Sequence, residues 1–156
     1  MKKQYNSEPC WTKNKCTTLT KDLFTQHIAT LVLNYEAALS NSIEKGGDLR
    51  ALLVHSGCED HYYGDDRSIA FQSYGHLIHW LPVNRPDQFV YFCSGEQPIY
   101  FQIVPEDYWY DQRIENNSWW ADCFRIIRLS KVQEIAKHLP KSIVGQLGYL
   151  GPNESI

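Results

Sequence analysis

The chain has 156 residues, of which 43% are apolar and 21% are charged, and these proportions are typical of one globular domain. Its 15 Lys and Arg residues against 18 Asp and Glu residues give a net charge of −3. This balance argues against a nucleic-acid-binding protein, which needs a basic face. We expect no membrane partner either, because no apolar run approaches the roughly 20 residues that span a bilayer.

The N-terminal sequence and the cysteines bear on the cellular compartment in which the protein works. Residues 1–8 carry positive charge but are not followed by the apolar stretch of a secretory signal, so we expect a cytoplasmic protein. The five cysteines are scattered, and none forms a CxxC pair. We therefore expect reduced thiols, with Cys93 and Cys123 buried in strands.

The first predicted element is a long helix. Residues 1–20 are polar and aperiodic, and we interpret them as a flexible arm. From Lys21 onward, with Thr20 as the N-cap, apolar residues recur at spacings of three and four until Gly46 and Gly47 end the pattern. The residues of this stripe are Phe24, Ile28, Leu31, Tyr35, Ala38, Leu39 and Ile43.

Short segments typical of β-strands follow the helix. Residues 50–56 form an almost continuous apolar run, as expected for a central strand. Residues 77–83, 89–93 and 99–104 are separated by turn-forming sequences, and this pattern predicts an antiparallel meander.

The remainder of the chain predicts both helices and strands. We expect helices over residues 105–110 and 131–138, a short helical turn over 119–122, and strands over 123–129 and 146–150. Two or more helices on a mixed sheet of five or six strands make an α/β sandwich.

One polar cluster contains several metal-ligating residue types. His55, Cys58, Asp60 and His61 lie close together in the sequence, although their spacing matches no known zinc or iron signature. A solvated loop after a strand is the simpler interpretation, and a small metal-dependent enzyme using these four residues is kept as an alternative. Cys58 follows a glycine, but the sequence shows no base beside it that would make it a nucleophile.

Two other pairs of polar residues are weaker candidates for a site. His76 and His79 fall within a predicted strand, where a separation of three would place their rings on opposite faces. Asp65 and Asp66 are adjacent and would point apart in extended chain, so they are a poor acid–base pair. One of them at a loop tip could instead anchor a cation or an ammonium group.

Several motifs resemble those of bacterial Xaa-Pro dipeptidases (prolidases) and the similar organophosphorus acid anhydrolases, in the same order and with similar gaps. The resemblance covers about residues 21–152. The matching segments are His27-Ile28-Ala29-Thr30-Leu31, Leu53-Val54-His55-Ser56-Gly57, Asp65-Asp66, Phe71, Trp80-Leu81-Pro82-Val83, Pro105-Glu106-Asp107-Tyr108-Trp109, Trp119 and Gly148-Tyr149-Leu150-Gly151-Pro152.

The resemblance implies a fold and a division of labour. Residues 21–152 would form a creatinase/prolidase N-terminal α/β domain with a ribonuclease-H-like mixed sheet, and residues 153–156 would begin a linker. In this family two manganese ions are held by Asp, His and Glu ligands of a C-terminal pita-bread domain, which lies beyond this sequence. The 156 residues alone would hold no cofactor and would be inactive.

The resemblance also assigns a role to the loop after the strand at residues 50–56. In the family, this domain contributes to a homodimer, and its loop reaches the active site of the neighbouring subunit. Asp66 would there bind the ammonium group of a dipeptide substrate by a charge-assisted hydrogen bond, with Asp65 and Phe71 as supporting neighbours. The alternative function is a stand-alone, non-catalytic relative that binds peptides or a protein partner.

Overall fold

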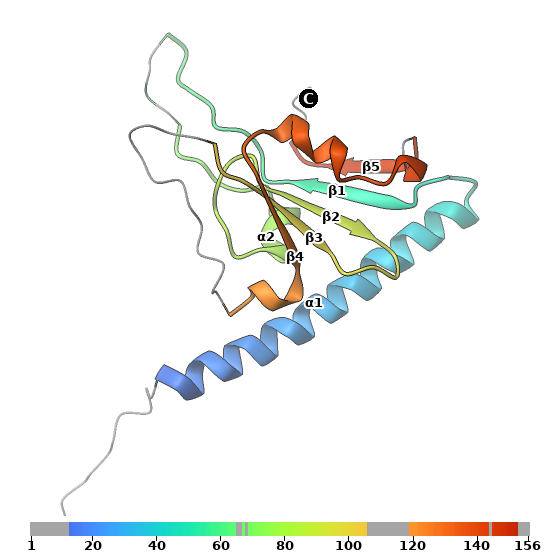
Figure 1. Cartoon of the computed structure of the whole chain (residues 1–156), viewed down its shortest axis with the longest axis horizontal. Helices are drawn as coiled ribbons and strands as arrows, with labels where there is room; N and C mark the ends of the chain where they lie inside the picture. The colour runs from blue at the N-terminus through green and yellow to red at the C-terminus, as the bar shows by residue number, and fades with distance from the viewer. Residues whose placement is uncertain (1–12, 65–66, 68, 106–118, 144, 153–156) are drawn as a thin grey trace, which may run out of the picture.

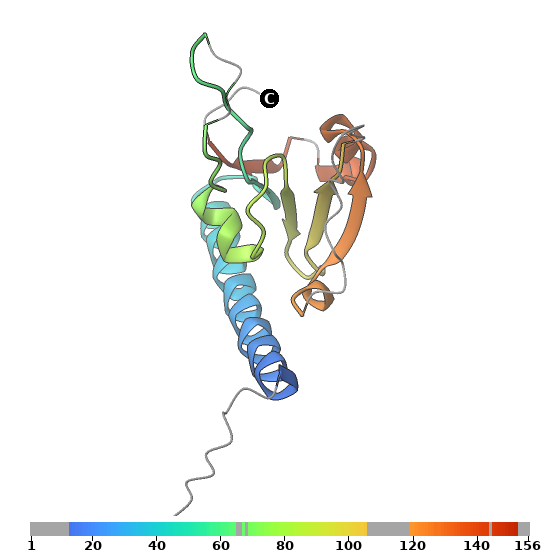
Figure 2. The same cartoon turned by 90° about the vertical axis from the view of Figure 1, so that its left-hand side faces the viewer.

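The computed structural model describes residues 13–64, 67, 69–105, 119–143 and 145–152. Its centre is a five-stranded sheet in the order β4-β3-β2-β1-β5, with helices on both faces (Figures 1 and 2). The helices are α1 (Lys13–Glu44) and α2 (Gly75–Trp80), with the 3₁₀ helices η1 (Ala121–Cys123), η2 (Val132–Lys137) and η3 (Lys141–Ile143). The strands are β1 (Ala51–His55), β2 (Phe89–Cys93), β3 (Ile99–Ile103), β4 (Arg125–Leu129) and β5 (Leu147–Leu150).

The sheet is mixed, as the sequence predicted. β1, β2 and β3 form an antiparallel meander, whereas β4 lies parallel to β3 and β5 lies parallel to β1. In this register Leu53 of β1 is opposite Tyr91 of β2 and Tyr149 of β5. β1 therefore lies between two strands, and all five of its residues are buried, as its continuous apolar sequence requires.

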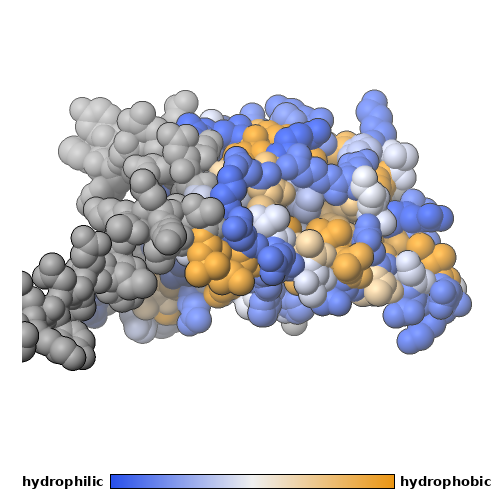
Figure 3. Space-filling model, turned by 90° about the horizontal axis from the view of Figure 1, so that it is seen from below, coloured by the Kyte–Doolittle hydropathy of each residue, from blue (hydrophilic) through white to orange (hydrophobic). Residues whose placement is uncertain are grey.

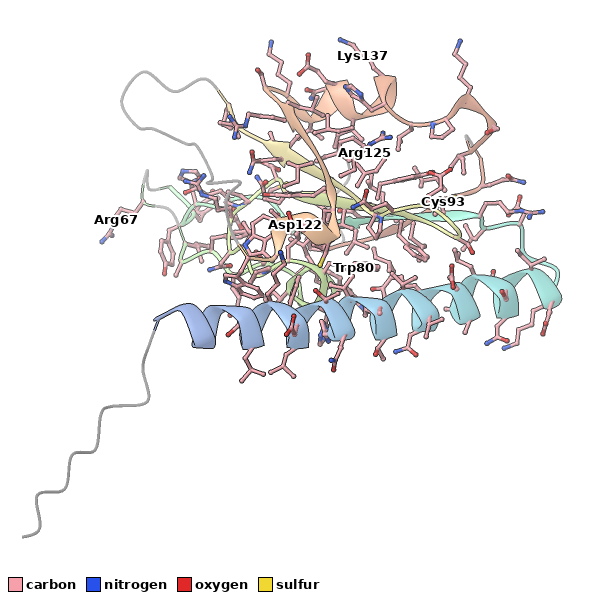
Figure 4. The ribbon with its side chains drawn as sticks, turned by 60° about the horizontal axis from the view of Figure 1, so that its bottom comes forward. Arg67, Trp80, Cys93, Asp122, Arg125 and Lys137 are labelled. Carbon is pink, nitrogen blue, oxygen red and sulfur yellow. The ribbon has the colours of Figure 1, made fainter. Side chains whose placement is uncertain are left out.

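Alternate residues of the strands supply two separate cores. One core lies between the sheet and the α1–α2 layer, where Trp80 is fully buried against Tyr35 and Phe92; Figure 4 shows Trp80 between α1 and the sheet. The other core lies between the sheet and η2 and η3, which contribute Ile135 and Ile143. The α/β sandwich expected from the sequence is confirmed.

The long helix α1 differs from its prediction at its N-terminal end. It begins at Lys13, so the expected start at Lys21 with a Thr20 cap is wrong, and residues 13–20 of the expected arm are helical. Residues 1–12 and the expected linker at 153–156 lie outside the described residues. Of the predicted stripe, Ile28 and Leu39 are buried in the core, whereas Ile43 is exposed.

Two other predictions need correction. Residues 77–83 do not form the expected strand: residues 77–80 lie in the short helix α2, in which Leu77 and Trp80 point into the core one turn apart. Cys123 lies in η1 rather than in a strand, and both Cys123 and Cys93 are half-buried. The helix expected at 131–138 is present, as a 3₁₀ helix over residues 132–137, and residues 106–110 of the helix expected at 105–110 lie outside the described part of the chain.

The outer surface of α1 is mostly polar. Viewed from below, the molecule shows a largely hydrophilic face with separate apolar patches (Figure 3), and Leu19, Leu23 and Leu33 are exposed. Lys21 of this helix forms an exposed ion pair with Asp122, which raises the pKa of the lysine. No helix in the described part of the chain combines the length and apolar character needed to cross a membrane.

Candidate functional site

The loop that leaves β1 extends beyond the end of the sheet (Figure 1). Its two arms are joined by backbone hydrogen bonds from Tyr62 N to Arg67 O (3.1 Å) and from Ile69 N to Asp60 O (2.8 Å). Tyr63 is fully exposed, and Arg67 points away from the body of the domain in Figure 4. Asp65 and Asp66, the two predicted substrate-binding carboxylates, lie outside the described residues.

A cavity of about 240 Å³ lies at the base of this loop. Its wall combines the residues that follow β1, both arms of the loop and the second residue after β5. The lining residues are Ser56, Gly57, Cys58, Asp60, Ile69, Ala70, Phe71, Gln72, Tyr74 and Pro152. The third predicted site residue, Phe71, is therefore part of a cavity wall, at the foot of the loop.

Close packing holds Phe71 against the end of β1. Gly57 has φ +100°, and a Cβ atom there would lie 3.2 Å from Pro152 Cγ and 3.8 Å from Phe71 Cε2. Asn84 fixes the backbone on the other side, since its Nδ2 donates to Phe71 O (3.3 Å) and its Oδ1 accepts from Ser73 N (2.8 Å). The base of the loop is thus rigidly placed by glycine geometry and an asparagine bridge.

A compact cluster of His55, Cys58 and Asp87 lies beside this cavity. One ligand-type atom from each residue lies within 4.8 Å of the other two. The His55 side chain is 4% exposed, and its ring stacks parallel on Phe89 at a centroid distance of 4.1 Å. His55 Nδ1 is hydrogen-bonded to the Tyr149 hydroxyl at 2.7 Å, so the ring is held from two sides.

Asp87 occupies the turn before β2 and was not predicted as a site residue. Its carboxylate Oδ1 lies 3.6 Å from His55 Nε2, and its backbone N donates to Gly57 O at 2.8 Å. The His55 imidazole and, less strongly, the Cys58 thiol hold the pKa of Asp87 below its usual value, against the opposing effect of partial burial.

The observed cluster differs from the four residues that are close together in the sequence. His55 and Cys58 meet, but Asp60 instead accepts a hydrogen bond from the backbone N of exposed His61 (2.8 Å). The third member of the cluster is Asp87. The pairing of the two strands could have identified Asp87. Antiparallel pairing of β1 with β2 sets Phe89 opposite His55, and the turn just before Phe89 therefore lies next to His55. The cluster also places an imidazole beside Cys58, where the sequence had shown no base.

The two histidines of α2 also lie differently from their prediction. His76 and His79 are one helical turn apart, and both line a groove of about 390 Å³ between α1 and α2, together with His27. Residues of this groove are hydrogen-bonded to one another. Tyr35 Oη is bonded to His76 Nδ1 (3.2 Å), and His27 Nε2 is bonded to His79 O (2.8 Å). The expected separation of His76 and His79 on opposite faces is therefore wrong.

Comparison with known proteins identifies the family. Residues 22–156 match the family described as the Xaa-Pro dipeptidase N-terminal domain. Among curated proteins, an Xaa-Pro dipeptidase of Escherichia coli O1:K1 is 31% identical over 131 residues, which are 83% of this chain and 28% of that protein. The Xaa-Pro dipeptidase of Serratia proteamaculans is 29% identical over 130 residues, or 81% of this chain and 28% of that protein.

A third relative has a similar identity and a similar coverage. The Xaa-Pro dipeptidase of Pseudoalteromonas atlantica is 28% identical over 120 residues, which are 76% of this chain and 26% of that protein. The chain thus spans about a quarter of the length of the curated relatives it matches. Because the family match extends over most of the sequence, the chain belongs to the Xaa-Pro dipeptidase N-terminal domain family.

Proposed function

We propose that this chain is the active-site-closing and dimer-forming domain of a cytoplasmic, manganese-dependent Xaa-Pro dipeptidase, which hydrolyses dipeptides with a C-terminal proline. The observation that carries the proposal is the family match over residues 22–156. The relatives it resembles are Xaa-Pro dipeptidases about four times longer than the matched region. A domain of this size is expected to assist a larger catalytic part.

The described residues do not fit a manganese pair. Two Mn²⁺ ions need a set of ligands rich in carboxylates, and among the described residues the group that could hold an ion has one carboxylate, one imidazole and one thiol. We propose that the manganese ligands lie outside the described residues. The contribution of these 156 residues is to recognise and enclose the substrate.

The loop between β1 and α2 is the element proposed to perform this role. Its base is fixed by Gly57, Phe71 and Asn84, while its outer part extends beyond the sheet (Figure 2). A loop with a rigid base can present a carboxylate to a neighbouring subunit. We propose that Asp66 does this and binds the ammonium group of the dipeptide, with Asp65 and Phe71 as neighbours.

Active-site complementation tests the cross-subunit role. One subunit of the complete dipeptidase would carry Asp66→Ala with its metal ligands intact, and the other would keep Asp66 but lack one metal ligand. If Asp66 acts across the dimer, mixed dimers regain one complete site although each parent is impaired. No recovery in dimers shown to be mixed would contradict the proposal, because a loop acting within its own subunit cannot be complemented.

The isolated chain provides a second test. The purified 156 residues are expected to show no hydrolysis of Xaa-Pro dipeptides with added Mn²⁺, whereas a chain that also contains the metal-binding part should be active. Turnover by rigorously pure material would contradict the proposed division of labour.

A further inference from the structure

Three metal-ligating side chains of different chemistry meet where β1 ends. His55 is the last residue of β1, Cys58 begins the loop that follows, and Asp87 lies in the turn before β2. Their ligand atoms are all within 4.8 Å of one another. The antiparallel pairing of His55 with Phe89 brings the turn to this position, so the fold itself assembles the group.

One nitrogen of this cluster is buried without a partner. His55 Nε2 has no hydrogen-bond partner among the described residues, although the His55 side chain is only 4% exposed. A buried polar atom in this state is unfavourable, and an ion or water bound there would relieve the cost. Asp87 Oδ1 at 3.6 Å is beyond normal hydrogen-bonding distance but leaves space for an ion bound to both atoms.

The orientation of the ring suits coordination through Nε2. The Tyr149 hydroxyl lies 2.7 Å from Nδ1, and a proton on Nδ1 donated to this oxygen leaves the lone pair on Nε2. Histidine ligands of metals are usually oriented by such a hydrogen bond from their other nitrogen. The stacking of the ring on Phe89 restricts its rotation further.

The donor set selects the class of metal. Imidazole, thiolate and carboxylate together suit Zn²⁺, whereas Mg²⁺, Ca²⁺ and Mn²⁺ prefer oxygen ligands. Zinc–nitrogen and zinc–oxygen bonds of about 2.0–2.2 Å at a tetrahedral angle require the two ligand atoms to be roughly 3.4 Å apart. The observed separation between His55 Nε2 and Asp87 Oδ1 is 3.6 Å, so this pair is already close to the required spacing.

We propose that His55 Nε2, Cys58 Sγ and Asp87 Oδ1 bind one Zn²⁺ ion, with a water molecule as fourth ligand. Cys58 is exposed and the Asp87 side chain is 42% exposed, which gives the ion and the water access from solvent. A metal held here would link the first residues of the loop to the turn before β2. It would therefore hold the wall of the neighbouring cavity, to which Cys58 belongs.

Cobalt substitution tests the proposal on the 156-residue chain. Co²⁺ titrated into reduced protein should give one equivalent of binding, with a near-ultraviolet thiolate-to-cobalt band and the visible absorption of a four-coordinate site, and Zn²⁺ should displace it. Cys58→Ser should abolish the band, whereas Cys123→Ser, which removes a half-buried thiol elsewhere in the domain, should leave it unchanged.

Further variants separate this site from the polar residues beside it. Asp87→Asn should weaken Co²⁺ binding at least tenfold, whereas Asp60→Asn and His61→Asn should not. Tyr149→Phe should weaken it about 10- to 100-fold by removing the hydrogen bond to Nδ1. Circular dichroism would confirm that each variant is folded. Absence of stoichiometric binding by the wild type, a band that survives Cys58→Ser, or equal effects of Asp87→Asn and Asp60→Asn would overturn the proposal.

Discussion

The Tyr100 hydroxyl donates a 2.7 Å hydrogen bond to Gln88 Oε1 inside the domain, where both side chains are buried. Gln88 Nε2 donates in turn to Ile103 O at 3.0 Å, and Gln88 N donates to Ser56 Oγ at 2.9 Å. These hydrogen bonds connect β3, through Gln88, to Ser56, the residue that follows β1. The polar core therefore contributes directly to the position of the loop base.

Removing the Tyr100 hydroxyl should destabilise the domain. Tyr100→Phe leaves Gln88 Oε1 buried without its donor, and the expected loss is about 1–3 kcal/mol in the free energy of unfolding. Urea denaturation would measure it. Tyr63→Phe is the control because Tyr63 is fully exposed, and its unfolding midpoint should not change. Equal effects of both substitutions would show that the buried hydrogen bond is not important.

The domain should lose stability in alkaline solution. Burial raises the pKa of Tyr100, and burial also raises the pKa of Tyr91, above the ordinary value of about 10. Below pH about 10 both the folded and the unfolded states hold the proton, and the contribution of these residues is complete. At higher pH the unfolded chain releases the proton first, so the free energy of unfolding falls.

Urea denaturation at about pH 8 and about pH 11 would measure this decline. Tyr100→Phe should show a shallower decline than the wild type, because it has no phenol to ionise at this position. A decline as steep as that of the wild type would mean that other groups dominate the alkaline transition.

Any side chain at position 57 should lower the stability of the domain. Gly57→Ala places a Cβ atom at φ +100° and 3.2 Å from Pro152 Cγ, and the backbone strain alone is expected to cost about 1–2 kcal/mol. Gly75→Ala is the control, because nothing lies within 4 Å of its Cβ position and its φ is not in the positive range. Thermal unfolding should show a lower midpoint for Gly57→Ala and no decrease for Gly75→Ala.

In a complete dipeptidase, Asp66→Ala should weaken recognition of the substrate. Loss of the charge-assisted hydrogen bond to the ammonium group is expected to lower kcat/KM roughly 10-fold or more, a change of about 1.5–3 kcal/mol. Metal content should be unchanged. Asp48→Ala, at an exposed position between α1 and β1, is the control, and kinetics equal to this control would contradict the role proposed for Asp66.

Sequence patterns failed where an element was short or polar. Residues 77–80 begin an apolar run that resembles a strand, yet Leu77 and Trp80 are buried together on one side of α2. Periodicity cannot distinguish the two structures over so few residues. Residues 13–20 carry no apolar stripe but extend α1 beyond its predicted start, because a helix can continue outward once its core-facing turns are packed.

Local sequence was sufficient for those features that depend on neighbours along the chain: the apolar stripe of α1, the buried run of β1 and the α/β class. The motifs also indicated the family that the comparisons then showed. Only the tertiary structure decided which distant side chains meet. Asp87 and Tyr149 reach His55 because β1 pairs with β2 on one side and with β5 on the other, and strand pairing depends on packing of the whole domain rather than on the residues of any one segment.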